Sequence, residues 1–123
     1  FEHRSFGEEL ALCQRYFYEL VSGTSKSFAT GAYYSSSLIA SDIRFPVTMR
    51  TTPTISFATG TNYYVAYGGS QADTFNTFTN TPRGSVNGCA LDCDGNGVSG
   101  TQGHGCNVST NNANAYIHAS AEL

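Results

Sequence analysis

The chain has 123 residues, of which 40% are hydrophobic and only 12% are charged, and its formal net charge is −3. This length predicts a single domain, residues 1–123, with a core of ordinary size. The weak acidic balance argues against a nucleic-acid partner, and no apolar run approaches the roughly 20 residues that span a bilayer, so we expect no membrane insertion. Because the first residue is Phe1, we expect a fragment or one domain of a longer polypeptide.

The N-terminal segment predicts one short helix followed by a strand. Ser5 and Glu8 are spaced as a capping box, and residues with good helix propensity follow, so we expect a helix over residues 6–13. The sequence QRYFYELV, residues 14–21, then alternates between two faces, which is typical of a strand. A polar loop over residues 22–27 ends this unit.

Six further segments are rich in β-branched and aromatic residues and are bounded by turn residues. They are residues 28–40, 43–50, 54–59, 63–67, 73–79 and 114–123. Low charge and abundant Thr, Tyr and Phe also favour a β-rich protein. Many short strands without β-α-β alternation predict an all-β protein, a jelly-roll-like antiparallel β-sandwich with one short N-terminal helix.

Two turn features refine this strand prediction. Pro46 cannot donate to a strand ladder, so it predicts an edge or a bulge within 43–50. The short GTN link at 60–62 predicts a hairpin turn between the segments on either side.

Residues 83–112 differ from the rest of the chain. They hold many glycines and three of the four cysteines, and they lack a sustained apolar pattern. A loop this long in a compact domain is usually functional or locally cross-linked, so we expect a Cys/Gly-rich loop here. Cys106 is the natural disulfide partner of Cys89 or Cys93, and such a closure would contribute roughly 3 kcal/mol. With His104, these cysteines could instead bind zinc, although the usual C-x2-C spacing is missing.

The stretch LDCDGNGVSG, residues 91–100, looks like the start of a calcium loop. Asp92, Asp94 and Asn96 alternate as oxygen ligands do, but position 12 of such a loop falls on Gly103, where a glutamate is required. We therefore interpret the stretch as a turn and expect no cofactor, with calcium as the weaker alternative.

The sequence offers no convincing catalytic constellation. His3, His104 and His118 stand alone, and no G-x-S-x-G motif is present. Asp92 and Asp94 could form a carboxylate pair, but neighbouring loop positions rarely hold the separation that glycoside cleavage needs. We expect a protein that is not an enzyme.

Three blocks carry a resemblance to a known family. They are ELALCQRYF (Glu9–Phe17), FPVTMRTTP (Phe45–Pro53) and the terminal SAEL (Ser120–Leu123). With them the chain resembles the C-terminal domains of bacteriophage virion fibre proteins. The resemblance implies a homotrimeric tip of a tail or head fibre that acts as an adhesin or a decoration. Such a domain assembles in the host cytoplasm and is exposed on the virion surface, with other virion proteins and a cell-surface glycan or other receptor as partners.

The first block also assigns two structural residues. Cys13 is expected as a buried small hydrophobic side chain. Arg15 is expected to pair with an acid such as Glu9 or to stack on Tyr16.

Residues 83–112 lie outside the resembling blocks, and loops on a rigid β scaffold commonly carry binding. We therefore expect a disulfide-closed loop over residues 87–106 that projects from one end of the sandwich. Its expected polar contact groups are Asp92, Asp94, Asn96 and His104. The expected aromatic platforms are Tyr33, Tyr34, Tyr63 and Tyr64, with one ring of each pair facing inward. Two other functions stay open: a purely structural capsid-cementing or trimerisation domain, and a secreted carbohydrate-binding module.

Overall fold

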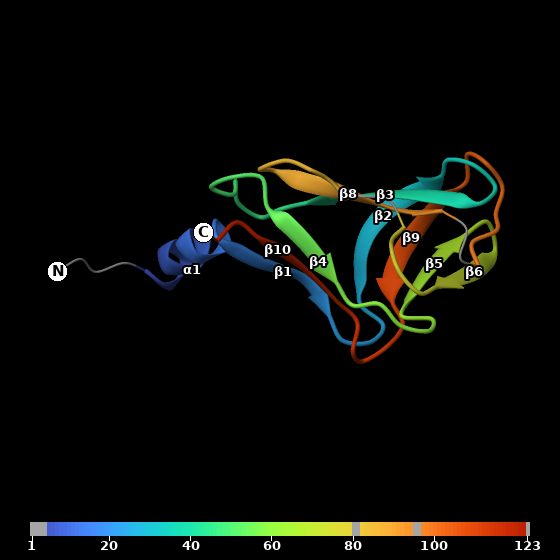
Figure 1. Cartoon of the computed structure of the whole chain (residues 1–123), viewed down its shortest axis with the longest axis horizontal. Helices are drawn as coiled ribbons and strands as arrows, with labels where there is room; N and C mark the ends of the chain where they lie inside the picture. The colour runs from blue at the N-terminus through green and yellow to red at the C-terminus, as the bar shows by residue number, and fades with distance from the viewer. Residues whose placement is uncertain (1–4, 80–81, 95–96, 123) are drawn as a thin grey trace.

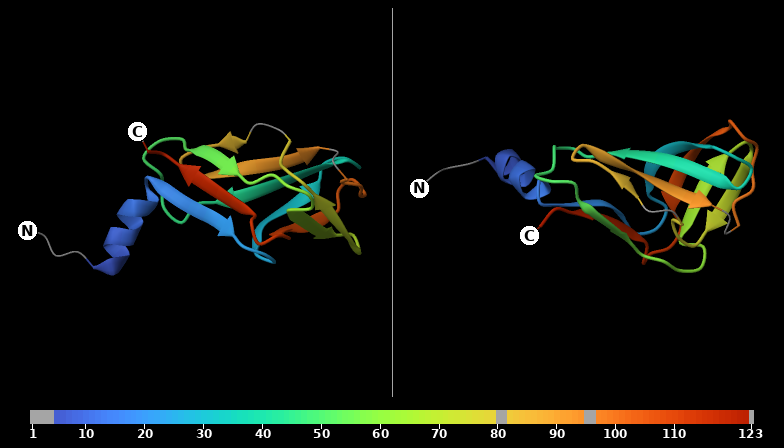
Figure 2. Two further views of the ribbon diagram at one scale, coloured as in Figure 1. Left: turned by 60° about the horizontal axis from the view of Figure 1, so that its bottom comes forward. Right: turned by 45° about the horizontal axis from the view of Figure 1, so that its top comes forward.

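The chain folds as one helix followed by two antiparallel β-sheets (Figure 1). The computed structural model describes residues 5–79, 82–94 and 97–122. Helix α1 spans Phe6–Gln14, and the hydroxyl of its N-cap residue, Ser5, accepts a hydrogen bond from the Glu8 N–H at 3.2 Å. The predicted helix is thereby confirmed. None of its nine residues is buried, and Figure 2 shows the helix extending from one end of the sandwich.

The smaller sheet has three strands in the order β1-β10-β4. Its strands are β1 (Phe17–Ser22), β10 (Tyr116–Ser120) and β4 (Thr54–Phe57). The pairing of β1 with β10 shifts register between Glu19 and Val21, which is the signature of a bulge. The last strand of the chain is therefore the centre of this sheet.

The larger sheet has seven strands in the order β6-β5-β9-β2-β3-β8-β7. The bounds are β2 (Ser27–Tyr33), β3 (Leu38–Arg44), β5 (Tyr64–Gly68), β6 (Gln71–Phe75), β7 (Arg83–Gly84), β8 (Gly88–Asp94) and β9 (Gly105–Thr110). The sheet curves, so that β5 and β6 lie at the end far from α1 (Figure 1).

The core lies between the two sheets and is rich in aromatic rings. Phe78 is its centre, because its ring lies 4.8 Å from that of Tyr64 and 5.3 Å from that of Phe57, centroid to centroid. The ring of Phe75 packs edge-on against Phe78 at 5.5 Å. Such edge-to-face pairs contribute roughly 0.5–1.5 kcal/mol each beyond the burial of their area. The predicted all-β antiparallel sandwich is confirmed.

Several predicted strand boundaries are wrong. Residues 28–40 are not one strand but a hairpin, in which the chain turns between Tyr33 and Leu38. The strand predicted over 43–50 ends at Arg44, directly before Phe45 and Pro46, because proline cannot donate to the ladder. The GTN link is not a hairpin turn, since β4 and β5 belong to different sheets.

The long loop predicted over residues 83–112 is also wrong. This segment contains β7, β8 and β9, and β8 pairs with β3 along its whole length. In β8 the side chains of Cys89, Leu91 and Cys93 are buried, as the core face of a strand requires. The many glycines of the segment obscured this alternation of buried and outward side chains in the sequence.

Candidate binding site

A cavity of about 390 Å³ opens where β3, β8 and the edge strand β7 lie side by side. Because Leu91 and Cys93 point into the core, Asp92 between them points to the other face of the sheet. Ala40 of β3 lies directly opposite Asp92 in the strand register. The residues that line this cavity are Tyr34, Leu38, Ala40, Arg83 and Asp92.

An ion pair forms one wall of the cavity. Arg83 binds Asp92 through both terminal nitrogens of its guanidinium. Nη1 donates to Oδ2, and Nη2 donates to Oδ1 at 3.2 Å. The Asp92 side chain is only 5% exposed whereas that of Arg83 is 63% exposed. A bidentate pair of this kind fixes the geometry of both groups and satisfies a buried carboxylate. The guanidinium therefore forms the solvent-facing side of the pair.

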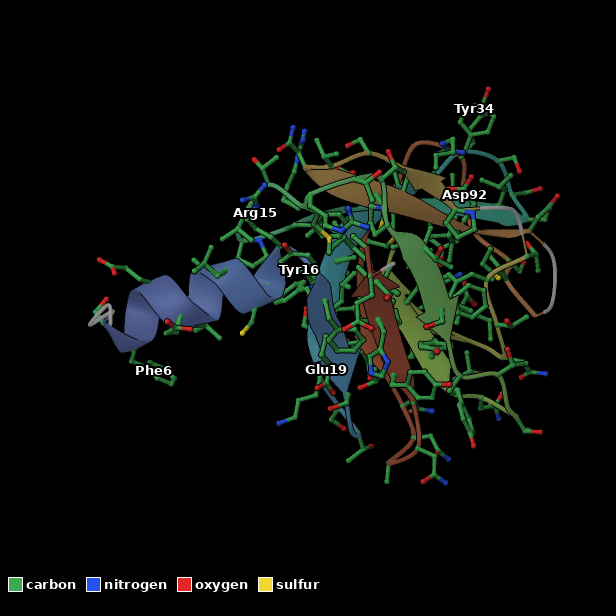
Figure 3. The ribbon with its side chains drawn as sticks, turned by 60° about the vertical axis from the view of Figure 1, so that its left-hand side comes forward. Phe6, Arg15, Tyr16, Glu19, Tyr34 and Asp92 are labelled. Atoms are coloured by element: carbon green, nitrogen blue, oxygen red, sulfur yellow. The ribbon has the colours of Figure 1, made fainter. Side chains whose placement is uncertain are left out.

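Tyr34 supplies an aromatic surface at the same place. It is the first residue after β2, and its backbone N–H donates to the Leu38 carbonyl at 2.9 Å, which closes the hairpin. Its side chain is the most exposed tyrosine of the described chain, since the residue is 72% exposed. Figure 3 shows Tyr34 pointing away from the sandwich on the same side as Asp92.

The lining combines three kinds of contact. Leu38 and Ala40 are half-buried and apolar, Tyr34 offers a free ring, and Arg83 has N–H groups that Asp92 does not use. Apolar surface with a few placed polar groups is typical of small-molecule sites, and aromatic rings suit the faces of sugar rings. The arrangement can bind a small polar molecule, and its described lining residues include no nucleophile paired with a base.

The four predicted tyrosine platforms differ in burial. Tyr33 is buried, and its hydroxyl donates to Asp73; burial, reinforced by this hydrogen bond, raises the pKa of Tyr33 to about 12. Tyr64 is fully buried and donates to the Ala58 carbonyl at 2.6 Å. Tyr63 is half-buried, and its ring packs against the core and over Gly60. The expected inward ring in each pair is thus found at Tyr33 and Tyr64.

The predicted polar contact groups are not gathered in one loop. Asp94 is exposed at the end of β8, and its backbone N–H donates to the Thr79 hydroxyl at 2.6 Å. His104 is exposed just before β9. Two strands, β2 and β3, lie between β9 and β8 in the sheet. Asn96 lies outside the described residues. Of the seven predicted contact residues that the structure describes, Asp92 and Tyr34 line the cavity.

This geometry does not support the zinc or calcium alternatives. The Asp92 carboxylate is engaged by Arg83 and is no open calcium ligand. Across residues 5–79, 82–94 and 97–122, no three His, Cys, Asp or Glu side chains gather in a group that could hold a metal ion.

The structure contradicts the predicted disulfide. All four cysteines are thiols. Strands β2 and β3 lie between β8 and β9, so Cys106 is about 14 Å from either β8 cysteine at the usual strand spacing. A disulfide requires Cα atoms within about 7 Å. The predicted disulfide-closed loop over residues 87–106 is therefore wrong.

Of the two residues assigned by the first block, Cys13 differs from expectation. Cys13 is exposed and not buried, because it lies on α1, of which no residue is buried. The guanidinium over the Tyr16 ring belongs to Arg50, at 5.6 Å from the ring centroid. Arg15 lines an open groove of about 620 Å³ with Ala11, Leu12, Val47 and others, and its pairing with an acid stays a prediction.

Sequence reasoning missed Arg83, Leu38 and Ala40. Leu38 and Ala40 alternate with the buried Ile39 and Ser41, so a strand beginning at Leu38 would have placed them on one outer face. No comparable signal marks Arg83, because its pairing with Asp92 depends on a strand contact that the sequence alone does not reveal.

Comparisons with known proteins add no further identification: no family model, curated protein or solved structure matches the chain. In the part of the chain that the structure describes, no helix is long and apolar enough to cross a membrane.

Proposed function

We propose that this chain is a non-catalytic domain of a phage virion fibre or decoration protein. It binds a host-surface glycan in the cavity that Tyr34 lines with Arg83 and Asp92, which we call the Tyr34 cavity. The observation that carries the binding role is the exposed Tyr34 ring beside the Arg83–Asp92 pair. The virion role rests on the resemblance of the ELALCQRYF and FPVTMR blocks to fibre proteins.

Physical chemistry favours a sugar over other ligands at this cavity. A pyranose face stacks on Tyr34, while its hydroxyl oxygens accept hydrogen bonds from Arg83. Arg83 is already held by Asp92, so little side-chain entropy is lost when a ligand binds. The strands β3, β7 and β8 hold these groups on a sheet, and preorganised groups bind more tightly than mobile ones.

The test uses two matched tyrosines on the larger sheet. Tyr34→Ala removes the proposed stacking ring, whereas Tyr67→Ala removes a ring that is 52% exposed on β5, away from the cavity. On a glycan array, we expect Tyr34→Ala to lose about 2 kcal/mol of binding, roughly thirtyfold in Kd, and Tyr67→Ala to bind like the parent. Both variants should unfold within about 0.5 kcal/mol of the parent. Equal glycan binding by Tyr34→Ala and the parent would refute the proposal.

A second role, in assembly, is favoured by α1. The helix has nine residues and buries none of them, although Phe6 is 82% exposed and Leu10 is 44% exposed. Isolated helices shorter than about 12–15 residues are marginal in water, so most helices need tertiary packing. We infer that the α1 helices of three copies pack together and cover these side chains in a homotrimer.

A further inference from the structure

We propose that the Tyr34 cavity selects an uncharged sugar that carries an acetamido group, such as an N-acetylhexosamine. This inference rests on the proposed function, because it names the class of glycan for the same cavity. The acetamido carbonyl would accept from Arg83, its methyl group would lie on Leu38 and Ala40, and the sugar ring would stack on Tyr34.

The charge of the cavity carries the first step. Among the described residues that line it, Arg83 is the cation and Asp92 is the anion, and the two form an ion pair. A ligand carboxylate would therefore meet a guanidinium that is already neutralised, next to a buried negative charge. An ammonium group would meet the guanidinium itself, which faces the solvent. The site thus disfavours both acidic and amino sugars.

Hydrogen-bond polarity carries the second step. Both carboxylate oxygens of Asp92 accept from Arg83, and the Asp92 side chain is almost fully buried. A guanidinium has five N–H groups, of which this pair uses two, so donors remain on the exposed side. The wall therefore offers donors to a ligand rather than acceptors. A carbonyl oxygen, which only accepts, fits this wall better than a hydroxyl, which also has to donate.

The apolar side chains carry the third step. Leu38 and Ala40 project from β3 beside the ion pair, and both are half-buried. A methyl group that covers them leaves water together with them, which favours binding in proportion to the apolar surface that is covered. An acetamido group presents a carbonyl and a methyl group on one short substituent, so it can contact Arg83 and Leu38 together.

The experiment varies the ligand on the unchanged protein. Binding of four disaccharides is titrated by calorimetry: N,N′-diacetylchitobiose, its deacetylated form, cellobiose and digalacturonate. One hydrogen bond with its apolar contact corresponds to about a tenfold change in Kd, so we expect diacetylchitobiose to bind about tenfold more tightly than the other three. Equal affinity for cellobiose, tighter binding of either charged sugar, or no binding of diacetylchitobiose overturns the inference.

Variants separate failure of this inference from failure of the proposed function. The double change Arg83→Gln with Asp92→Asn keeps a neutral hydrogen-bonding pair and should abolish the preference for the acetamido sugar. Tyr34→Ala should weaken all four sugars alike, with Tyr67→Ala as the control. If sugars bind through Tyr34 without the acetamido preference, the inference fails and the proposed function stands. If no glycan on the array or in the panel depends on Tyr34, both fail.

Discussion

The three cysteines of the larger sheet show how burial controls side-chain chemistry. Burial raises the pKa of the Cys89 thiol to about 11 and that of Cys93 to about 12, and it also raises the pKa of Cys106. Thiolates, not thiols, are the reactive species, so these side chains are inert at neutral pH. Cys13, on the exposed helix, has no such protection.

Thiol titration therefore has a specific expected outcome. At pH 8 the folded protein should react rapidly with a thiol reagent at Cys13, and the other cysteines should react only after unfolding. The folded pKa values of Cys89 and Cys93 lie above the unfolded value of 9.0, so the buried neutral thiols contribute to the stability of the fold. This contribution to the free energy of unfolding is complete below about pH 9. It should be lost as the pH rises through 11 and 12, which denaturant titration at each pH can measure.

The control for this experiment is Cys13→Ser, which should make the folded protein unreactive. Fewer than four thiols per chain after denaturation without a reductant would contradict the structure, because it would reveal a disulfide.

Glycines at close strand contacts decide stability at the scale of the elements. A Cβ added at Gly31 on β2 would lie 2.9 Å from the Ser41 Cα and closer still to the Ala40 carbonyl oxygen. Backbone cannot move aside cheaply, so we expect Gly31→Ala to lower the free energy of unfolding by about 2–3 kcal/mol. Urea denaturation measures this change.

The matched control is a glycine of the helix. Gly7 lies in α1, and beyond its chain neighbours and the backbone of its own helix, the nearest atom to an added Cβ would be the Ser5 Oγ at 4.0 Å. Gly7→Ala should leave stability unchanged or raise it, by up to about 1 kcal/mol, because alanine favours helix. Equal effects of the two substitutions would contradict the strand packing described for Gly31.

Elements fixed by local signals were predictable, and those fixed by distant contacts were not. The helix was found because Ser5 caps it within three residues. The hairpin between Tyr33 and Leu38 was missed because none of its turn residues has a positive φ, so the turn needs no glycine or asparagine. The disulfide prediction failed because the sheet order, which separates β8 from β9, is not written in the spacing of the cysteines.

The candidate site was half predictable for the same reason. Alternation between neighbouring residues predicted one outward ring in the Tyr33–Tyr34 pair, and the outward ring is that of Tyr34. The burial of Asp92 depends on Arg83, which reaches it from β7 across the sheet edge.

At the scale of the whole molecule, a single chain leaves the apolar side chains of helix α1 exposed to solvent. We expect light scattering to give three times the chain mass of 13.1 kDa for the parent protein. Phe6→Ala with Leu10→Ala removes the apolar contact and keeps helix propensity, so this variant should be a monomer with an unchanged β-sheet spectrum. Tyr67→Ala, which removes an exposed ring elsewhere, should remain a trimer. A monomeric parent would contradict the assembly role.

We propose that the outer face of β3, β7 and β8 binds a glycan. Chemical-shift mapping of the isotope-labelled domain, titrated with the glycan that binds most tightly on the array, tests it most directly. We expect the largest amide shifts at Tyr34, Leu38, Arg83 and Asp92, with Tyr67 unchanged. Shifts centred on α1 or on the smaller sheet, with none at these four residues, would contradict it.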